Sequence, residues 1–173
     1  MSQTKLKGSP VHLHGQLPAL HMHAPAFTLV DKDLKDKTLH DFAGKAKIIT
    51  TVPSLDTGLC SIMTKHFNEA AKKHPGGVIL VVSADLPFAS KRFCEAEHVH
   101  NVHTLSMMRS KEFGKAYGIL IEDGPLAGLL ARSVWVLDTK DRIVHVELVA
   151  EITEEPNYHK AIAAWESVLH HRA

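Results

Sequence analysis

Cysteine, net charge and long apolar runs are all scarce in this sequence, and each shortage excludes a class of protein. Two cysteines in 173 residues cannot supply a framework of disulfides, and a chain of this length can bury enough apolar surface to fold without one. Lys and Arg total 20 against 19 for Asp and Glu, and no basic stripe alternates with aromatics, so nucleic acid and acidic membranes are not expected partners. The sequence has no run of roughly 18 apolar residues and no apolar segment behind its basic start, so we expect a soluble protein, cytoplasmic if bacterial.

Strands and helices alternate along most of the chain, which is the pattern of an α/β domain. Apolar and β-branched runs or turn signals predict strands at 4–7, 10–14, 24–30, 48–52, 78–83, 102–105, 129–137 and 143–149. Apolar spacing and helix-start signals predict a helical turn at 38–44 and helices from about 61 to 75, at 89–97, at 110–117 and at 155–169. We therefore expect one thioredoxin-like domain over residues 1–173, with a mixed central sheet flanked by helices and an N-terminal hairpin extension at 1–23.

Cys60 lies where a buried strand ends and an amphipathic helix begins. Unpaired backbone N–H groups and the positive end of the helix dipole favour a thiolate there, which makes Cys60 a candidate nucleophile. Thr57 can place a hydroxyl near the sulfur, while Pro53 and Pro25 are stiff apolar residues able to shield it from water. Two plainer interpretations stay open: Cys60 as a small buried apolar residue, and Thr57, together with Asp56, as a helix cap.

A second cysteine and an arginine extend this candidate site. Arg132, predicted near the start of a strand, is a permanent cation that can stabilise a thiolate and hold an oxygen of a polar substrate, although a surface ion pair is the plainer interpretation. Cys94 is a candidate resolving thiol. Both cysteines are predicted on helices, so joining them requires local unwinding, and the absence of a Cys-x-x-Cys pair counts against a general disulfide oxidoreductase.

Histidine is the one residue type in excess, with fourteen copies in three groups and several singles. The groups are His12/His14/His21/His23, His98/His100/His103 and His170/His171. Alternating histidines on one face of a strand can hold a metal ion, but no Cys-x-x-Cys or His-Glu-x-x-His motif accompanies them, so a solvated face is favoured. Three alternatives thus remain beside thiolate chemistry with a resolving cysteine: a thiol–disulfide oxidoreductase, a histidine-rich metal-binding protein and a redox-inert scaffold.

The segment 53–60, Pro-Ser-Leu-Asp-Thr-Gly-Leu-Cys, resembles the Pro-x-x-x-Thr-x-x-Cys signature of peroxiredoxins. Further segments make the chain similar to the bacterial thiol peroxidase subfamily of atypical 2-Cys peroxiredoxins: 24–27, 83–89, 92–94, 117–118, 124–129, 131–134 and 154–158. The sequence departs from the family pattern at Ala26, where many members have Asp, at Leu59, where Val is common, and in the histidine-rich stretch 12–23.

This resemblance implies a role for each candidate residue. Cys60 would be the peroxidatic cysteine, Cys94 the resolving cysteine, and Pro53, Thr57 and Arg132 the rest of the pocket. The implied activity is reduction of hydrogen peroxide and organic hydroperoxides to water and alcohols, through a Cys60 sulfenic acid and a Cys60–Cys94 disulfide, in antioxidant defence. The family's reductant is thioredoxin, its members are homodimers, and no metal, haem or flavin is required.

Overall fold

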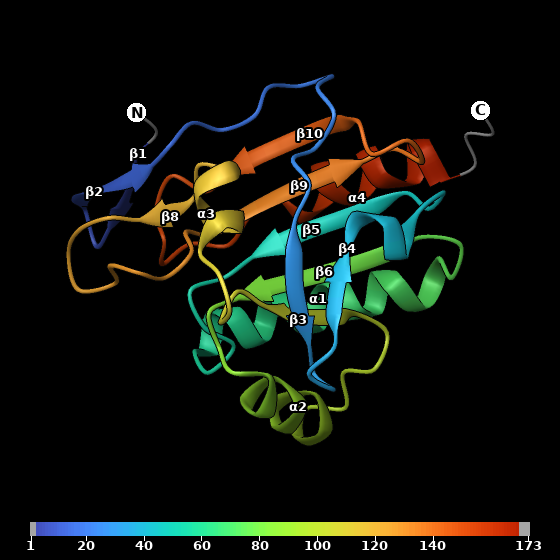
Figure 1. The fold of residues 1–173 in the computed structure, drawn as a ribbon, viewed down its shortest axis with the longest axis horizontal. Coiled ribbons are helices and arrows are strands. Elements are labelled where there is room, and N and C mark those ends of the chain that lie inside the picture. The colour runs from blue at the N-terminus through green and yellow to red at the C-terminus, as the bar shows by residue number, and fades with distance from the viewer. Residues whose placement is uncertain (1–2, 170–173) are drawn as a thin grey trace.

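A seven-stranded mixed sheet forms the centre of the protein, seen in a computed structural model that describes residues 3–169 (Figure 1). Its strands lie in the order β10-β9-β5-β6-β7-β3-β4, with β5, β6 and β7 parallel and the other pairs antiparallel. The bounds are β3 Thr28–Asp31, β4 Asp36–Thr38, β5 Lys47–Thr51, β6 Val78–Ser83, β7 His103–Ser106, β9 Ser133–Leu137 and β10 Ile143–Leu148. The expected thioredoxin-like fold, a mixed sheet flanked by helices, is confirmed.

Helices cover both faces of this sheet, which separates two apolar cores. Their bounds are η1 Leu39–Phe42 (a 3₁₀ helix), α1 Gly58–Lys73, α2 Pro87–Ala96, α3 Glu112–Ala116 and α4 Tyr158–Leu169. One core joins α1 and α4 to the sheet through Phe67 and Trp165, and the other packs η1 and α3 on the opposite face around Trp135. Every residue of β5 and β6 is buried, because apolar side chains on both sides of these central strands enter a core.

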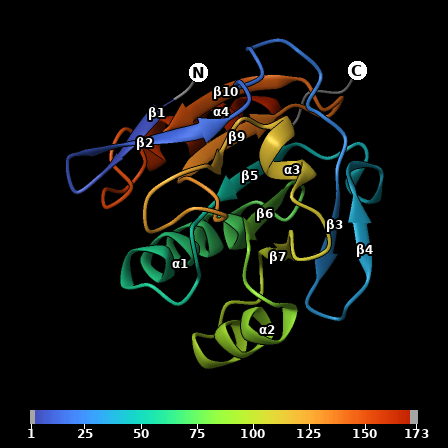
Figure 2. The same ribbon diagram turned by 60° about the vertical axis from the view of Figure 1, so that its left-hand side comes forward.

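The two cysteine-bearing helices start at the same edge of the sheet. Since β5 and β6 are parallel neighbours, the chain leaves both strands at their carboxyl ends and enters α1 and α2 respectively (Figure 2). The segments before α1 and before α2 therefore lie close enough to bond directly, as described below.

The N-terminal hairpin is present as expected, and it belongs to a second, three-stranded sheet. Strands β1 (Gln3–Leu6) and β2 (Ser9–His14) pair antiparallel, and β8 (Leu120–Ile121) pairs with β2. The hairpin is tied to the segment after β10, because Lys5 N–H donates to the Ala150 carbonyl and Ile152 N–H donates to the Lys5 carbonyl, at 3.0 and 2.8 Å. The Glu151 carboxylate also accepts a 2.8 Å bond from Gly8 N–H in the hairpin turn.

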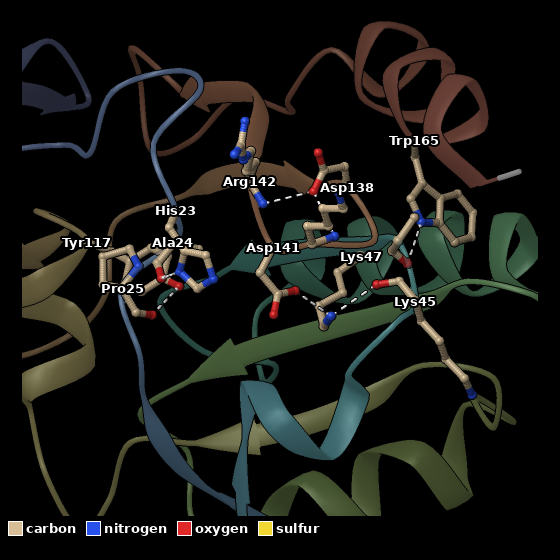
Figure 3. A network of polar contacts seen from close by, with 12 residues as sticks. His23, Ala24, Pro25, Lys45, Lys47, Tyr117, Asp138, Asp141, Arg142 and Trp165 are labelled. Atoms are coloured by element: carbon tan, nitrogen blue, oxygen red, sulfur yellow. Dashed lines mark hydrogen bonds and ion pairs between the residues drawn. The ribbon is translucent and has the colours of Figure 1, made fainter. Parts of the chain in front are cut away.

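A buried ion pair lies at the amino end of β5, away from both cysteines (Figure 3). Lys47 has no exposed surface, and its Nζ lies 2.5 Å from Asp141 Oδ1 and 3.0 Å from the Lys45 carbonyl. Asp141 is in the turn between β9 and β10, and its carbonyl accepts a 2.8 Å bond from Ala24 N–H. The pair thus joins a central strand to the hairpin turn and to the chain entering β3.

Several boundaries differ from those expected. Strand β3 begins at Thr28, and α1 and α2 begin at Gly58 and Pro87, so each helix starts two or three residues earlier than its apolar pattern suggested. Strand β9 begins at Ser133, so Arg132 lies in the segment just before the strand and not within it. Strands β4 and β8 were not expected from the sequence, because they are short and lack an apolar alternation. No helix among residues 3–169 is long and apolar enough to cross a membrane.

Candidate active site

Cys60 is the third residue of α1, so it sits where the helix backbone has unpaired N–H groups. Thr57 is the N-cap, with extended φ and ψ of −119° and 148°, and its Oγ1 accepts a bond from Cys60 N–H at 3.3 Å. The Thr57 hydroxyl in turn donates to the Ser54 carbonyl at 3.4 Å. The capping interpretation of Thr57 is therefore confirmed, and Cys60 itself is completely buried.

Arg132 is buried and directs its guanidinium at Cys60. Its Nε donates to the Ile152 carbonyl at 2.8 Å, and its Nη1 lies 3.3 Å from Cys60 Sγ and 2.9 Å from Met63 Sδ. Within residues 3–169 no carboxylate pairs with this guanidinium, so the surface ion pair considered from the sequence is wrong. The side chain is only 3% exposed, and among its contacts in the described chain Cys60 is the one group that can carry a negative charge.

Tyr158, the first residue of α4, lies beside this pair. Its ring stacks on His66 of α1 with 3.9 Å between centroids, and its hydroxyl donates to Glu155 Oε1 at 2.8 Å. Burial raises the pKa of Tyr158, as do the bond to Glu155 and the nearby Cys60, while the charge of Arg132 lowers it. Tyr158 is therefore a protonated hydroxyl close to the site, anchored to α1 by the ring stack.

Cys94 lies on α2 with its thiol in the same core as Cys60. Both cysteines are free, and Cys94 is 4% exposed. Burial raises the pKa of the Cys94 thiol, and a long 4.0 Å contact with Thr104 Oγ1 opposes this only in part. In this form of the protein Cys94 is thus a protonated thiol held inside a helix.

The two prolines expected to shield Cys60 lie in different places. Pro53 is buried in the loop between β5 and α1, and its shielding of Cys60 stays a prediction. Pro25 is not there: its carbonyl accepts a 2.8 Å bond from Tyr117 Oη, whose ring packs in the core on the opposite face of the sheet (Figure 3). The expectation that Pro25 shields Cys60 is wrong, because residues 21–24 follow the turn between β9 and β10 instead.

Three contacts of the site were missed from the sequence. Met63 belongs to the apolar spacing that predicts α1, yet its position one turn after Cys60 places both sulfurs on one helix face. The Ile152 carbonyl lies 20 residues from Arg132 and carries no sequence signal. Asp85 accepts bonds from Ser54 Oγ and Leu55 N–H, both at 2.7 Å, and its position just before a helix with Pro at its start is the one hint available.

The histidine groups do not gather as metal ligands in the described part of the chain. No cluster of three or more His, Cys, Asp or Glu side chains suited to a metal ion occurs among residues 3–169. His12 and His14 instead pair with Asp123 and Glu122, at 2.6 and 3.0 Å, where β2 runs beside β8. His170 and His171 lie outside the described residues.

Comparison with known proteins places this geometry in a family. A family model described as Redoxin matches residues 19–162. The chain belongs to the Redoxin family. It is 50% identical over 171 residues to a thiol peroxidase of Leptospira interrogans, an alignment that covers 98% of this chain and 100% of the relative.

Solved structures of other family members agree with this placement. A peroxiredoxin-like protein from Aquifex aeolicus is 42% identical and aligns with a TM-score of 0.92, covering 97% of this chain and 98% of the other. A thiol peroxidase from Chromobacterium violaceum, at 23% identity, has a TM-score of 0.86 with 96% and 94% coverage, which supports the fold alone. Within the Redoxin family the chain is therefore a member of the bacterial thiol peroxidase group of peroxiredoxins.

Proposed function

We propose that this thiol peroxidase reduces hydroperoxides at Cys60, forms a disulfide with Cys94 and is reset by thioredoxin. One observation carries the proposal: Arg132 is a buried cation without a carboxylate partner in the described chain, and it points Nη1 at Cys60 Sγ from 3.3 Å. A buried guanidinium needs a compensating anion, and a thiolate at the start of α1 provides one.

In the first step the Cys60 thiolate attacks the distal oxygen of the hydroperoxide. The S–O bond forms as the O–O bond breaks, and the leaving oxygen takes a proton to become water or an alcohol, which leaves Cys60 as a sulfenic acid. Arg132 stabilises the charge that develops on the leaving oxygen, Thr57 fixes the helix start that carries Cys60, and Pro53 keeps bulk water away.

In the second step Cys94 condenses with the sulfenic acid. The Cys94 sulfur bonds to Cys60 Sγ, and the sulfenic hydroxyl leaves with the thiol proton as water. Both cysteines are buried on separate helices, so α1 and α2 unwind locally before the sulfurs meet. Thioredoxin then reduces the disulfide by exchange, and the cycle requires no metal, haem or flavin. The working unit we propose is a homodimer.

The test is a coupled assay of hydroperoxide, thioredoxin, thioredoxin reductase and NADPH. We expect Cys60→Ser to lose turnover, Cys94→Ser to lose most of it, and neither variant to form the intramolecular disulfide. Ser61→Ala, next to Cys60 in the same helix, is the matched control and keeps the parent rate. A Cys60→Ser variant with the activity of the parent would overturn the proposal.

A further inference from the structure

Asp85 lies in the turn between β6 and α2 and aims its carboxylate across to the loop before α1. Ser83, the last residue of β6, holds it in place: the Ser83 hydroxyl donates to Asp85 Oδ2 at 2.8 Å, and the Asp85 N–H donates to the same hydroxyl oxygen at 3.2 Å. The carboxylate is therefore oriented by its own strand before it contacts the neighbouring loop.

Two further bonds to this carboxylate come from the loop that leads to Cys60. Ser54 Oγ donates to Oδ1 and Leu55 N–H donates to Oδ2, each at 2.7 Å. No Lys, Arg or His pairs with Asp85 in the described part of the chain, so its charge is compensated by these neutral donors. Hydrogen bonds to a charged acceptor are among the stronger ones in proteins.

The bonds continue from Ser54 toward Cys60. The Ser54 hydroxyl oxygen accepts from Asp56 N–H at 3.1 Å, and the Ser54 carbonyl accepts from Thr57 Oγ1, the atom that caps Cys60 N–H. Asp85 thus fixes the loop from which the first turn of α1 starts, while it is itself two residues from the start of α2. One side chain ties together the beginnings of both cysteine-bearing helices.

We propose that Asp85 is a positioning residue that acts as a latch on the two-cysteine cycle. While its bonds to Ser54 and Leu55 hold, Cys60 stays beside Arg132, the arrangement that reacts with peroxide. The bonds must break before α1 and α2 separate and unwind, so the latch sets how often the sulfenic acid reaches Cys94. A groove of about 530 Å³ lined by Ser54, Asp85 and Phe93 among others lies along the same junction, which gives the loop room to lift.

This inference rests on the proposed function and predicts opposite effects on two competing fates of the sulfenic acid. Condensation with Cys94 needs the open latch, whereas a second peroxide reaches Cys60 only in the closed arrangement and yields sulfinic acid. Weakening the latch therefore speeds disulfide formation and lowers the sulfinic fraction at high peroxide. A merely structural contact would change stability without shifting this partition.

The test measures both fates by rapid quenching and mass spectrometry across a series of hydrogen peroxide concentrations. We expect Asp85→Ala to form the disulfide about tenfold faster or more, the effect of losing bonds to one charged acceptor, and to need a correspondingly higher peroxide concentration for half-maximal sulfinic acid. Asp85→Asn and Ser54→Ala should show smaller shifts in the same direction. These two variants keep most of the contacts and serve as the test where Asp85→Ala does not fold.

Asp56→Asn is the matched control, since Asp56 is an exposed carboxylate in the same loop whose side chain makes no hydrogen bond in the described structure. It should keep the partition of the parent. Unchanged or slower disulfide formation in the folded Asp85 and Ser54 variants would overturn the latch. That result differs from a failure of the proposed function, in which Cys60→Ser would retain peroxidase activity.

Discussion

Lys47 and Arg132 are the two basic side chains buried among the described residues, and the fold compensates them in different ways. Lys47 has Asp141 at 2.5 Å. Arg132 has two sulfur atoms and one carbonyl oxygen. A buried cation without an anion is costly, so the missing carboxylate is informative: under the function that we propose, the counter-ion of Arg132 is the Cys60 thiolate itself.

The Lys47–Asp141 pair gives a prediction for stability. Asp141→Asn should lower the free energy of unfolding by about 3–5 kcal/mol, because it leaves a fully buried ammonium without its anion. Lys47→Met should cost less, since the Asp141 side chain is 15% exposed and can be solvated. Urea unfolding of both single variants and of the double variant measures this.

The double variant is the internal control. Its loss should be smaller than the sum of the single losses, because it leaves no unpaired charge. Asn is a suitable replacement at position 141, where φ is 63° and Asn is tolerated better than most residues. Strictly additive losses would show that the pair is not coupled.

At the scale of elements, the N-terminal hairpin supports the active site from a distance. Its strand β1 bonds to residues 150 and 152, and the Ile152 carbonyl holds Arg132 Nε. Glu151 strengthens the junction: backbone N–H groups of Thr153 and Gly8, at 3.0 and 2.8 Å, lower its pKa to about 2. Because this pKa lies below the ordinary value of 4.5, the stabilisation is complete above about pH 4.5 and is lost as pH falls toward 2.

Glu151→Gln should loosen this junction at neutral pH. We expect the Gly8 and Thr153 amides to exchange with deuterium about two- to tenfold faster, the range typical of weakening one hydrogen bond. Glu154→Gln, an exposed glutamate in the same segment, is the control and should leave both amides as in the parent. Equal exchange rates in the two variants would contradict a role for the Glu151 carboxylate.

The sequence predicted elements well where one physical signal dominates. The uninterrupted apolar run at 78–83 predicted both ends of β6 correctly, because a continuous apolar run of this length is typical of a strand that is buried on both faces. The pairing of β1 with β2 followed from turn glycines, one of which, Gly8, has φ of 84°. Strands β4 and β8 were missed because their pairing partners, and not their own residues, make them strands.

The site was predictable in its residue types but not in its contacts. The position of Cys60 at a helix start follows from local pattern, and so does its cap by Thr57. The approach of Arg132 to Cys60, separated by 72 residues, and the bonds of Asp85 to a loop 30 residues earlier depend on strand order, which local pattern does not encode. Pro25 is the opposite case: its residue type suited a shield for Cys60, but the fold places it beside Tyr117.

At the scale of the whole molecule, two histidines make stability depend on pH. Burial lowers the pKa of His103 below its usual 6.5, and three nearby lysines lower it further. Burial also lowers the pKa of His145, whose Nε2 has no hydrogen-bond partner among the described residues. As pH falls through 6.5 the unfolded chain binds protons at these sites before the folded chain does, so the free energy of unfolding decreases.

We expect the urea concentration at the unfolding midpoint to decrease as the pH is lowered from 7.5 to 5.5. The decrease should be smaller in a His103→Gln, His145→Gln double variant. Unfolding curves at pH 7.5, 6.5 and 5.5 measure the difference. A double variant in which His12 and His14 are replaced by Gln is the control, because those rings face carboxylates at the surface. A parent and a His103/His145 variant with parallel pH dependence would contradict the assignment.

The separation of the two cores has an optical consequence. The chain has two tryptophans, and each core contains one: Trp135 lies on one face of the sheet, and Trp165 shares the other face with both cysteines. Each face thus carries a single tryptophan. With Trp135 replaced by Phe, all tryptophan emission comes from Trp165, so the tryptophan fluorescence of the unlabelled protein reports on the half of the molecule that contains Cys60 and Cys94.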